Sequence, residues 1–419
     1  MIRASALYIV IIIALVIGLL CAAVIGSAYF YRAQYQKKFR YDQLAANLQS
    51  GIVILTANTD STYQREKLFS LFGGDADSVS LQKTDWGLYE VGIAKAFIQK
   101  DTLYKAFSLA NQIDSDKRAA LYLIDEDRPF SLSGKTSIRG NVWIPKAGVQ
   151  QAYIDNHAYS GDRRLIVGNK HNSDKQLPPL NQNRINGLDA FFKQVSGTQI
   201  ILKDSLKNSF LKPSQYINFK KDPSILSQKF LSGNMVLLSD TTLIIDSTST
   251  LNNILVFAKA IVVRGGFHGR CQLFARDSIS IGKNCSFAYP SVLGIIRTGD
   301  NLIKSQEKIQ IGDKSHINGI IFSYEKSANP LKPLIFLGKN SRVSGQLYSQ
   351  GVLQLNDGCE IDGNVFTSRF WYRTPFTLYE NYLINTTIDS KALSRYYLGS
   401  KLLPTSNKKK KVLQWLEAN

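Results

Sequence analysis

The sequence contains few of the side chains that most enzymes use to bind metals or transfer protons. Its 419 residues include four histidines, four cysteines and two methionines. The histidines lie far apart and form no His-x-His, His-Glu-x-x-His or His/Asp arrangement, so each is expected to be a surface or loop residue. They are His157, His171, His268 and His316.

The cysteines indicate neither a metal site nor a compartment. Cys21 lies inside an apolar N-terminal segment, and Cys271, Cys285 and Cys359 show no Cys-x-x-Cys or Cys/His spacing. If two of these three formed a disulfide, one would remain unpaired. Cysteine usage therefore does not identify the redox environment.

Motifs of nucleotide-binding and hydrolytic enzymes are absent as well. The sequence has no Gly-x-Ser-x-Gly elbow, no phosphate-binding loop and no Gly-x-Gly-x-x-Gly after a strand. We therefore predict that the protein is not an enzyme. We expect no catalytic residue, no cofactor, no metal and no small-molecule substrate.

Two enzyme classes that use β-helices stay open as alternatives. The segment 311–317 matches one hexad of the left-handed acyltransferases, but the hexads do not run on continuously. Polysaccharide lyases and hydrolases need carboxylates from adjacent turns, because acid and base must flank one glycosidic bond. The available acids occupy corner positions, where Asp is common for backbone reasons alone. They are Asp277, Asp313, Asp357 and Asp362.

The chain is basic, with 51 lysines and arginines, 32 acidic residues and a net charge of +19. Lysines are scattered along it, and the one dense run is Lys408–Lys411. A nucleic-acid binder usually gathers its charge on one face or arm. We interpret the charge as a solvated surface. Attraction to an anionic polymer, such as DNA, acidic glycan or a lipid surface, is the alternative.

A long uncharged segment opens the chain. Residues 4–31 carry no charge and are apolar almost throughout, which meets the roughly 20 residues that a membrane-spanning helix needs. Tyr29 and Tyr31 at its end suit the headgroup layer. A cleaved signal peptide would have an apolar region of only about 7–15 residues. We predict a single transmembrane helix that continues as an amphipathic helix, together covering residues 1–50.

Two arguments about the orientation of this helix disagree. Arg32, Lys37, Lys38 and Arg40 follow the apolar segment while only Arg3 precedes it, which favours a cytoplasmic body. However, the segment 3–10 and the long helix after it resemble the start of minor pilins and pseudopilins of type IV pilus and type II secretion systems. This resemblance implies a body outside the cytoplasm. The sequence departs from the family in having Ala4 at the position of the expected glycine and no glutamate in the apolar run.

Residues 51–127 are predicted to form a small β-rich connector. Short apolar runs with β-branched and aromatic residues indicate strands. The expected strands are 52–55, 79–81, 86–93 and 121–124, and short helices are expected at 67–72 and 106–113.

An internal repeat dominates the rest of the sequence. Three segments share an apolar-x-apolar pair, a polar turn and then apolar-x-Gly-x-apolar, and they are 309–321, 335–347 and 353–365. Related starts are found at 243, 261 and 279, so three of the five steps are 18 residues. The steps of 30 and 26 residues become 18 if 298–308 and 325–333 contain loops. Such a pattern predicts a β-solenoid with alternate apolar residues inside and Gly, Asn or Asp at corners. A β-sandwich is the alternative.

The segment 132–142 repeats the same pattern, so the β-solenoid is predicted to cover residues 128–370 with an insertion at 146–235. Within that insertion a helix is expected at 187–195. Long insertions in solenoids often form the binding face, so we predict a partner-specific surface there. The rungs of 309–367 also resemble bactofilins, which implies a short-turn β-helix.

Residues 371–419 are predicted to form an aromatic cap at the open end of the solenoid and a solvated basic tail. Together these features indicate a mainly β, single-pass membrane protein of the cell envelope, with a structural or assembly role and other envelope or pilus-like proteins as partners. A membrane-tethered carbohydrate-active enzyme and a binder of an anionic polymer are the alternatives.

Overall fold

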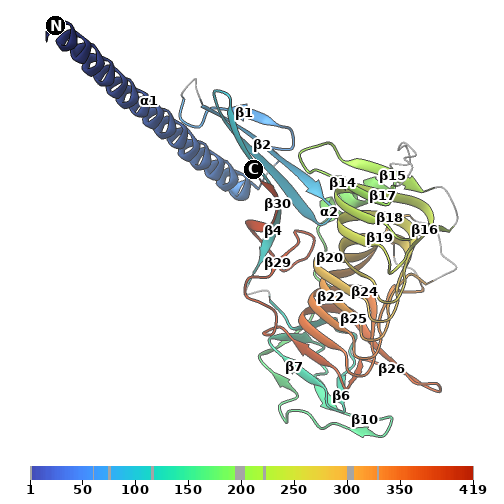
Figure 1. The fold of residues 1–419 in the computed structure, drawn as a ribbon. Coiled ribbons are helices and arrows are strands. Elements are labelled where there is room, and N and C mark those ends of the chain that lie inside the picture. The colour runs from blue at the N-terminus through green and yellow to red at the C-terminus, as the bar shows by residue number, and fades with distance from the viewer. Residues whose placement is uncertain are drawn as a thin grey trace. The chain divides into compact units, whose positions relative to one another are not determined.

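A computed structural model describes residues 2–59, 61–73, 77–114, 118–193, 203–219, 223–299, 306–327 and 330–418. The chain is mainly β, with one long N-terminal helix (Figure 1). It divides into two compact units. The first contains residues 1–83, 92–106 and 418–419, and the second contains residues 84–91 and 107–417.

Helix α1 (Ile2–Ala57) forms most of the first unit. Its first half exposes its apolar side chains, whereas its last part buries a single stripe made by Leu44, Leu48, Ile52 and Leu55. Spacings of four, four and three residues place these side chains on one helical face. The strand predicted at 52–55 is therefore wrong, and the helix runs seven residues beyond its predicted end at 50. Helical packing of Ile52 and Leu55 prevails over the β preference of the run Ile-Val-Ile-Leu.

An antiparallel sheet contributes residues 67–69, 77–83, 92–98 and 101–106 to the first unit. Its first four strands follow the order β1 (Lys67–Phe69), β2 (Asp77–Trp86), β3 (Tyr89–Ile98) and β4 (Asp101–Ile113). The strand expected at 79–81 is confirmed. The short helices expected near 67–72 and 106–113 are wrong, because 67–69 and 106–113 are strands. In β4 an unbroken run of buried residues, Ala106–Asn111, hides the alternation that identifies a one-sided strand.

The second unit is built from parallel strands that stack in register. The first three long ones are β17 (Phe230–Ile245), β18 (Thr250–Val263) and β19 (His268–Ile281), and Figure 1 shows them side by side. The register predicted from the repeat is confirmed at every step, since each predicted start pairs with the next. These paired residues are Leu243, Ile261, Ile279, Ile309, Ile335 and Leu353.

The two longer steps of the repeat keep this register. The remaining strands of the array are β20 (Ser286–Arg297), β21 (Lys308–Ile311), β22 (His316–Glu325), β23 (Leu334–Leu337), β24 (Arg342–Leu355) and β25 (Glu360–Arg373). Between β20 and β21 the described residues 298, 299, 306 and 307 lie outside the strands, as do 326, 327 and 330–333 between β22 and β23. This agrees with the predicted loops except that 308 and 325 belong to strands; residues 300–305 and 328–329 lie outside the described residues.

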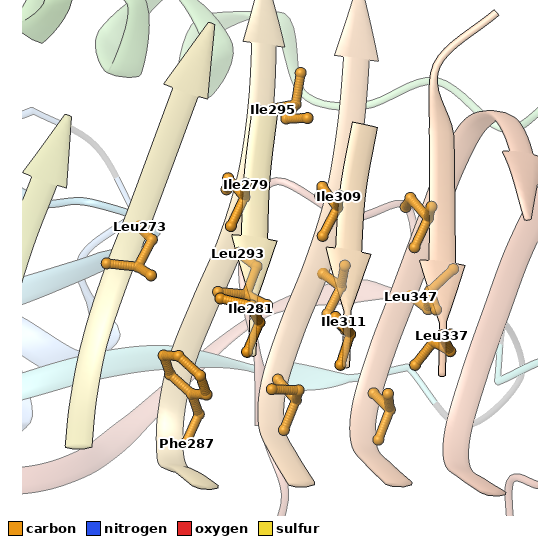
Figure 2. Packing of buried hydrophobic residues seen from close by; sticks show 14 of the residues in the cluster. Leu273, Ile279, Ile281, Phe287, Leu293, Ile295, Ile309, Ile311, Leu337 and Leu347 are labelled. Carbon is orange, nitrogen blue, oxygen red and sulfur yellow. The ribbon is translucent and has the colours of Figure 1, made fainter. Parts of the chain in front are cut away.

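The core of the second unit is a column of aliphatic side chains. Figure 2 shows Ile279 beside Ile309 and Ile281 beside Ile311 on neighbouring strands. These side chains are at most 2% exposed. Each fully buried Leu or Ile contributes roughly 1.5–3 kcal/mol relative to an exposed one, so the stack is stabilised mainly by this column.

A corner of the array is made by glycine. Gly319, Gly345 and Gly363 pair with one another across successive strands, at φ values of 148° to 153°. A Cβ on Gly345 would lie 1.9 Å from the carbonyl oxygen of Gly319. Because both the backbone angle and the space exclude a side chain, the glycine of the repeat is a requirement of the turn.

The prediction of an insertion at 146–235 is wrong, because strands from this range pair with the stack at both of its ends. Strands β9 (Val149–Gln151), β12 (Ile166–Val167) and β13 (Lys170–Asn172) extend one end of the stack, where they pair with β6 (Phe130–Ser133), β7 (Ser137–Arg139) and β8 (Val142–Ile144). At the other end of the stack, β17 pairs with β14 (Ser205–Asn208), β15 (Gln215–Phe219) and β16 (Ser224–Leu226). Strands β10 (Tyr153–Ile154) and β11 (His157–Ala158), which lie between β9 and β12 in the sequence, form an antiparallel hairpin. These end strands are short and polar, which masks their repeat.

One helix, α2 (Gln182–Phe192), does lie in this part of the chain. The helix expected at 187–195 thus begins five residues earlier, after the N-cap Asn181, whose side chain accepts from the Arg184 amide. Residues 194 and 195 lie outside the described residues.

The C-terminal segment also differs from its prediction. Strand β26 (Leu378–Glu380) folds back on β25, and β27 (Tyr382–Ile384) and β28 (Thr387–Asp389) form a further turn. Ile388 pairs with Ile361 on one side and Ile138 on the other, so further turns follow the aromatic segment and it is not a terminal cap. Strand β5 (Leu121–Leu123), expected in the connector, pairs with β25 in the same stack.

The basic tail is a strand as well. After β29 (Leu398–Gly399), the chain ends in β30 (Ser406–Ala418). Lys410 is buried and its Nζ lies 2.5 Å from Glu90 Oε2. The predicted solvated tail is therefore wrong: one of the four consecutive lysines is an internal ion-pair partner.

Candidate functional site

The first candidate functional element is the N-terminal half of α1. Its apolar side chains between Leu7 and Tyr31 are mostly exposed, including isoleucines, leucines and valines in succession. By length and composition this helix is long and apolar enough to cross a membrane. A soluble surface rarely exposes such a continuous apolar area.

The other end of α1 is fixed by polar contacts within the first unit. Arg40 pairs with Asp101 at 3.0 Å. At the helix end the buried Lys83 donates to the backbone oxygen and to Oδ1 of Asn58, both at 2.7 Å. A cation at this position neutralises the unpaired carbonyls and the negative end of the helix dipole. The second half of the helix is thus attached to the first unit by both polar and apolar contacts.

The histidines and cysteines form no catalytic or metal-binding cluster in the described part of the chain. All four histidines are exposed. Cys271, Cys285 and Cys359 are free and buried, and burial raises the pKa of each thiol, that of Cys359 to about 12. No cluster of three His, Cys, Asp or Glu side chains suited to a metal occurs within the described ranges.

The four corner acids each have their own partner. Asp277 lies 4.0 Å from Lys259, Asp313 lies 2.9 Å from Lys283, and Asp362 lies 2.6 Å from Arg342. The hydrogen bond from Lys283 lowers the pKa of Asp313. Asp357 accepts from the Asn385 amide at 3.5 Å. In the pairs of Asp277 and Asp362 the partner lies on the neighbouring strand, and in the pair of Asp313 it lies in the preceding turn, so these acids brace the stack.

The second candidate is a row of aromatic side chains on the outside of the parallel strands. In-register pairing brings one aromatic from each of several strands into line, with one gap at Gly294. Ring centroids lie 4.8 Å apart for Phe257 and Phe274 and 6.1 Å apart for Tyr348 and Phe366. We call this set the aromatic row: Phe257, Phe274, Phe322, Tyr348, Phe366, Tyr122, Trp143 and His171.

Helix α2 covers one end of the aromatic row. Phe191 stacks on Phe257 at 4.8 Å, and the Arg276 guanidinium lies 4.1 Å from the centre of the Phe192 ring. Asp189 accepts from Arg276 at 2.5 Å and from Thr298 at 2.6 Å. Burial opposes the ionisation of Asp189, but these hydrogen bonds and one from Lys193 lower its pKa overall. α2 is therefore fastened by both apolar and charged contacts.

The segment 176–182 crosses the row further along. Three tyrosine hydroxyls fasten it: Tyr122 donates to the Gln176 carbonyl, Tyr348 to the Pro178 carbonyl and Tyr324 to the Gln182 side chain. The donor–acceptor distances are 3.4, 3.0 and 3.0 Å. Residues of this segment line two open cavities.

We name these cavities the aromatic pocket and the polar groove. The aromatic pocket has a volume of about 190 Å³ and is lined by Ala119, Tyr122, Trp143, Pro178, Phe366, Pro404 and Thr405. The polar groove has a volume of about 330 Å³, and its polar lining residues are Lys175, Gln176, Gln182, Tyr324, Tyr348, Gln350 and Ser368. The two linings together contain no histidine and no carboxylate.

Two buried amide side chains adjoin the aromatic pocket. Gln346 donates to the Thr405 hydroxyl at 2.6 Å, and Asn364 donates to the Ala119 carbonyl. The amide oxygens, Gln346 Oε1 and Asn364 Oδ1, are buried without a hydrogen-bond partner in the described part of the chain. Unpaired buried acceptors are uncommon because each costs roughly 1–3 kcal/mol.

The sequence contained a partial signal for this site. Tyr348 and Phe366 are separated by one 18-residue step, and aromatic residues at that offset on the outward positions could have indicated the row. Tyr122 could not be placed, because it pairs with Phe366, more than 200 positions away, and Trp143 takes its place in the row from its pairing with Tyr122.

Comparisons with known proteins leave the family open. No protein-family model matches the chain, and no curated protein matches it. A solved structure, that of the competence-associated pilin ComZ from Thermus thermophilus, matches at 10% identity and a TM-score of 0.22, over 93% of this chain and 96% of that one. At that score the match carries no argument about fold or function.

Proposed function

We propose that this chain is a single-pass, membrane-anchored assembly protein of the cell envelope with a pseudopilin-like arrangement. The observation that carries the proposal is α1. Its first half presents an exposed apolar surface of membrane-spanning length, and its last part buries one stripe of side chains within the first unit. A helix divided in this way suits insertion in a bilayer at one end and attachment to a folded body at the other.

We further propose that the body is a β-solenoid that offers surfaces to other proteins. The in-register parallel pairing, the 18-residue steps and the aligned corner glycines support it. The resemblance of residues 309–367 to bactofilins supports only the arrangement of short parallel strands in this proposal.

We also propose that the role is not catalytic. The aromatic pocket and the polar groove are lined without the acid–base pair that glycoside cleavage requires, and the corner acids are engaged in separate contacts. The body is proposed to lie outside the cytoplasm, in accordance with the pseudopilin-like arrangement.

Protease accessibility tests this proposal. An epitope placed after Asn419 directly follows strand β30, so its loss reports the side on which the body lies. We expect digestion in intact cells, or once only an outer membrane has been opened, while a cytoplasmic marker protein survives. Protection until the inner membrane is lysed would place the body in the cytoplasm and overturn the envelope assignment.

A further inference from the structure

The aromatic pocket has the size and walls for one ring of a ligand. Its volume of about 190 Å³ is below the roughly 300–1,000 Å³ typical of sites for larger small molecules. Tyr122 and Trp143 are paired across neighbouring strands, yet among the described aromatic residues no ring contact joins them. Tyr122 stacks instead on Phe366 at 5.9 Å, and Trp143 on His171 at 4.7 Å. The pocket therefore offers two separate aromatic surfaces to one guest.

Two amides are buried behind the lining of the aromatic pocket. Gln346 and Asn364 are at most 1% exposed, and each donates its NH₂ group to a residue that lines the pocket. Their oxygens are buried too and neither residue is part of the lining, so the hydrogen-bonding groups open to a guest are those of the polar groove. A hydroxylated ring can use these groups, whereas a hydrocarbon or a proline ring cannot.

The charge of the two cavities indicates that the ligand is neutral. The seven residues of the aromatic pocket include no cation and no carboxylate, and the eleven of the polar groove include a single cation, Lys175. This neutrality is local, since the whole chain has a net charge of +19. Single-stranded nucleic acids are held by a track of cations beside stacking aromatics, and such a track is not part of these linings.

We propose that the aromatic pocket binds one sugar ring of a neutral glycan and that the polar groove holds the adjoining units beyond Pro178. Aromatic rings provide the apolar surface for the ring faces, and the amides of Gln176, Gln182 and Gln350 can both donate to and accept from hydroxyls. No carboxylate or histidine lines the cavities, so the glycan is held and not cleaved. This binding is independent of the side of the membrane on which the body lies.

Titration of the detergent-solubilised full chain with neutral oligosaccharides tests the inference. The probes are the hexamers and dimers of β-1,4-glucose, α-1,4-glucose and β-1,4-N-acetylglucosamine, followed by calorimetry, with twelve-residue oligothymidylate as the anionic probe. We expect at least one hexamer to bind with a dissociation constant below about 1 mM and more tightly than its dimer. Trp143→Ala should weaken that binding at least about tenfold.

Trp415→Ala is the matched control. Trp415 is a half-exposed tryptophan on β30 that lies outside both linings, so its loss should leave glycan binding unchanged. Should Trp143→Ala fail to fold, Trp143→Phe and the groove variant Gln350→Ala replace it, with weaker binding expected for both. Absence of binding to every hexamer, or binding that ignores these variants, would overturn the inference. Binding of oligothymidylate alone, falling steeply with salt and lost in the Trp143 variant, would identify a nucleic-acid site instead.

Discussion

At the scale of one residue, the buried Glu307 makes the stability of the second unit depend on pH. Burial raises the pKa of Glu307 to about 7, although its ion pair with Arg297 acts in the opposite direction. One of its oxygens, Oε2, is buried without a hydrogen-bond partner in the described residues. The carboxyl group is therefore more easily protonated in the folded chain than in the unfolded one.

The sign of the effect on stability follows from this difference. Between the ordinary pKa of 4.5 and about 7 the folded state binds the extra proton, so this contribution is full below pH 4.5 and is lost as the pH rises through 7. Replacing Glu307 by Gln removes the titration. We expect the free energy of unfolding of Glu307→Gln, relative to the unmodified chain, to rise by on the order of 3 kcal/mol between pH 5 and pH 8. Denaturant unfolding at the two pH values measures it, and a constant difference would show that Glu307 titrates normally.

At the scale of elements, the corner glycines decide whether neighbouring turns can stack. Gly345→Ala places a Cβ against the Gly319 carbonyl at a φ of 153°, so we expect a loss of about 3 kcal/mol or more in the free energy of unfolding. Gly187→Ala is the control within α2, where no atom lies within 4 Å of the added methyl group. That change should stabilise the chain by about 0.5–1 kcal/mol, because alanine favours a helix interior. Equal effects of the two substitutions in thermal unfolding would contradict the role assigned to the corner.

The strands also show which parts of the fold could be predicted from the sequence. Register from Leu243 to Leu353 was predictable because inward aliphatics and corner glycines recur at fixed offsets, and a parallel stack leaves such a pattern little freedom. The turn made by Leu121 and Ile388 was not predictable. It joins β5 and β28 from distant parts of the chain beside β25, and such pairing leaves no local signal.

The candidate site was predictable to a smaller extent than the fold. The aromatic row follows from the register, but the aromatic pocket depends on Pro178 and Pro404, which come from irregular segments. The segment 176–182 was expected within a binding surface, and its residues contribute to the linings of both cavities. Its position relies on hydroxyls of Tyr122 and Tyr348, which no periodicity connects to it.

At the scale of the whole molecule, the exposed apolar half of α1 and the core of the second unit are separable. The main hydrophobic core consists entirely of residues between Ala120 and Ile388, all within the second unit, and α1 contributes none of it. The exposed apolar half of α1 is therefore not needed to bury this core. It would cost free energy in water, at roughly 25 cal/mol for each Å² of apolar surface, unless a membrane covers it.

This separation predicts different behaviour for two forms of the chain. The complete protein should stay in the membrane pellet after washing with 1 M salt, because insertion of an apolar helix does not depend on charge. A variant lacking residues 2–31 should appear in the soluble fraction, and the transition of the second unit should melt within about 2 °C of its position in the complete protein. Release of the complete protein by salt would instead mean that its net charge of +19 holds it to an anionic surface, since such attraction is screened. The apolar half of α1 would then have to be covered by protein, and the single-pass anchor would be wrong.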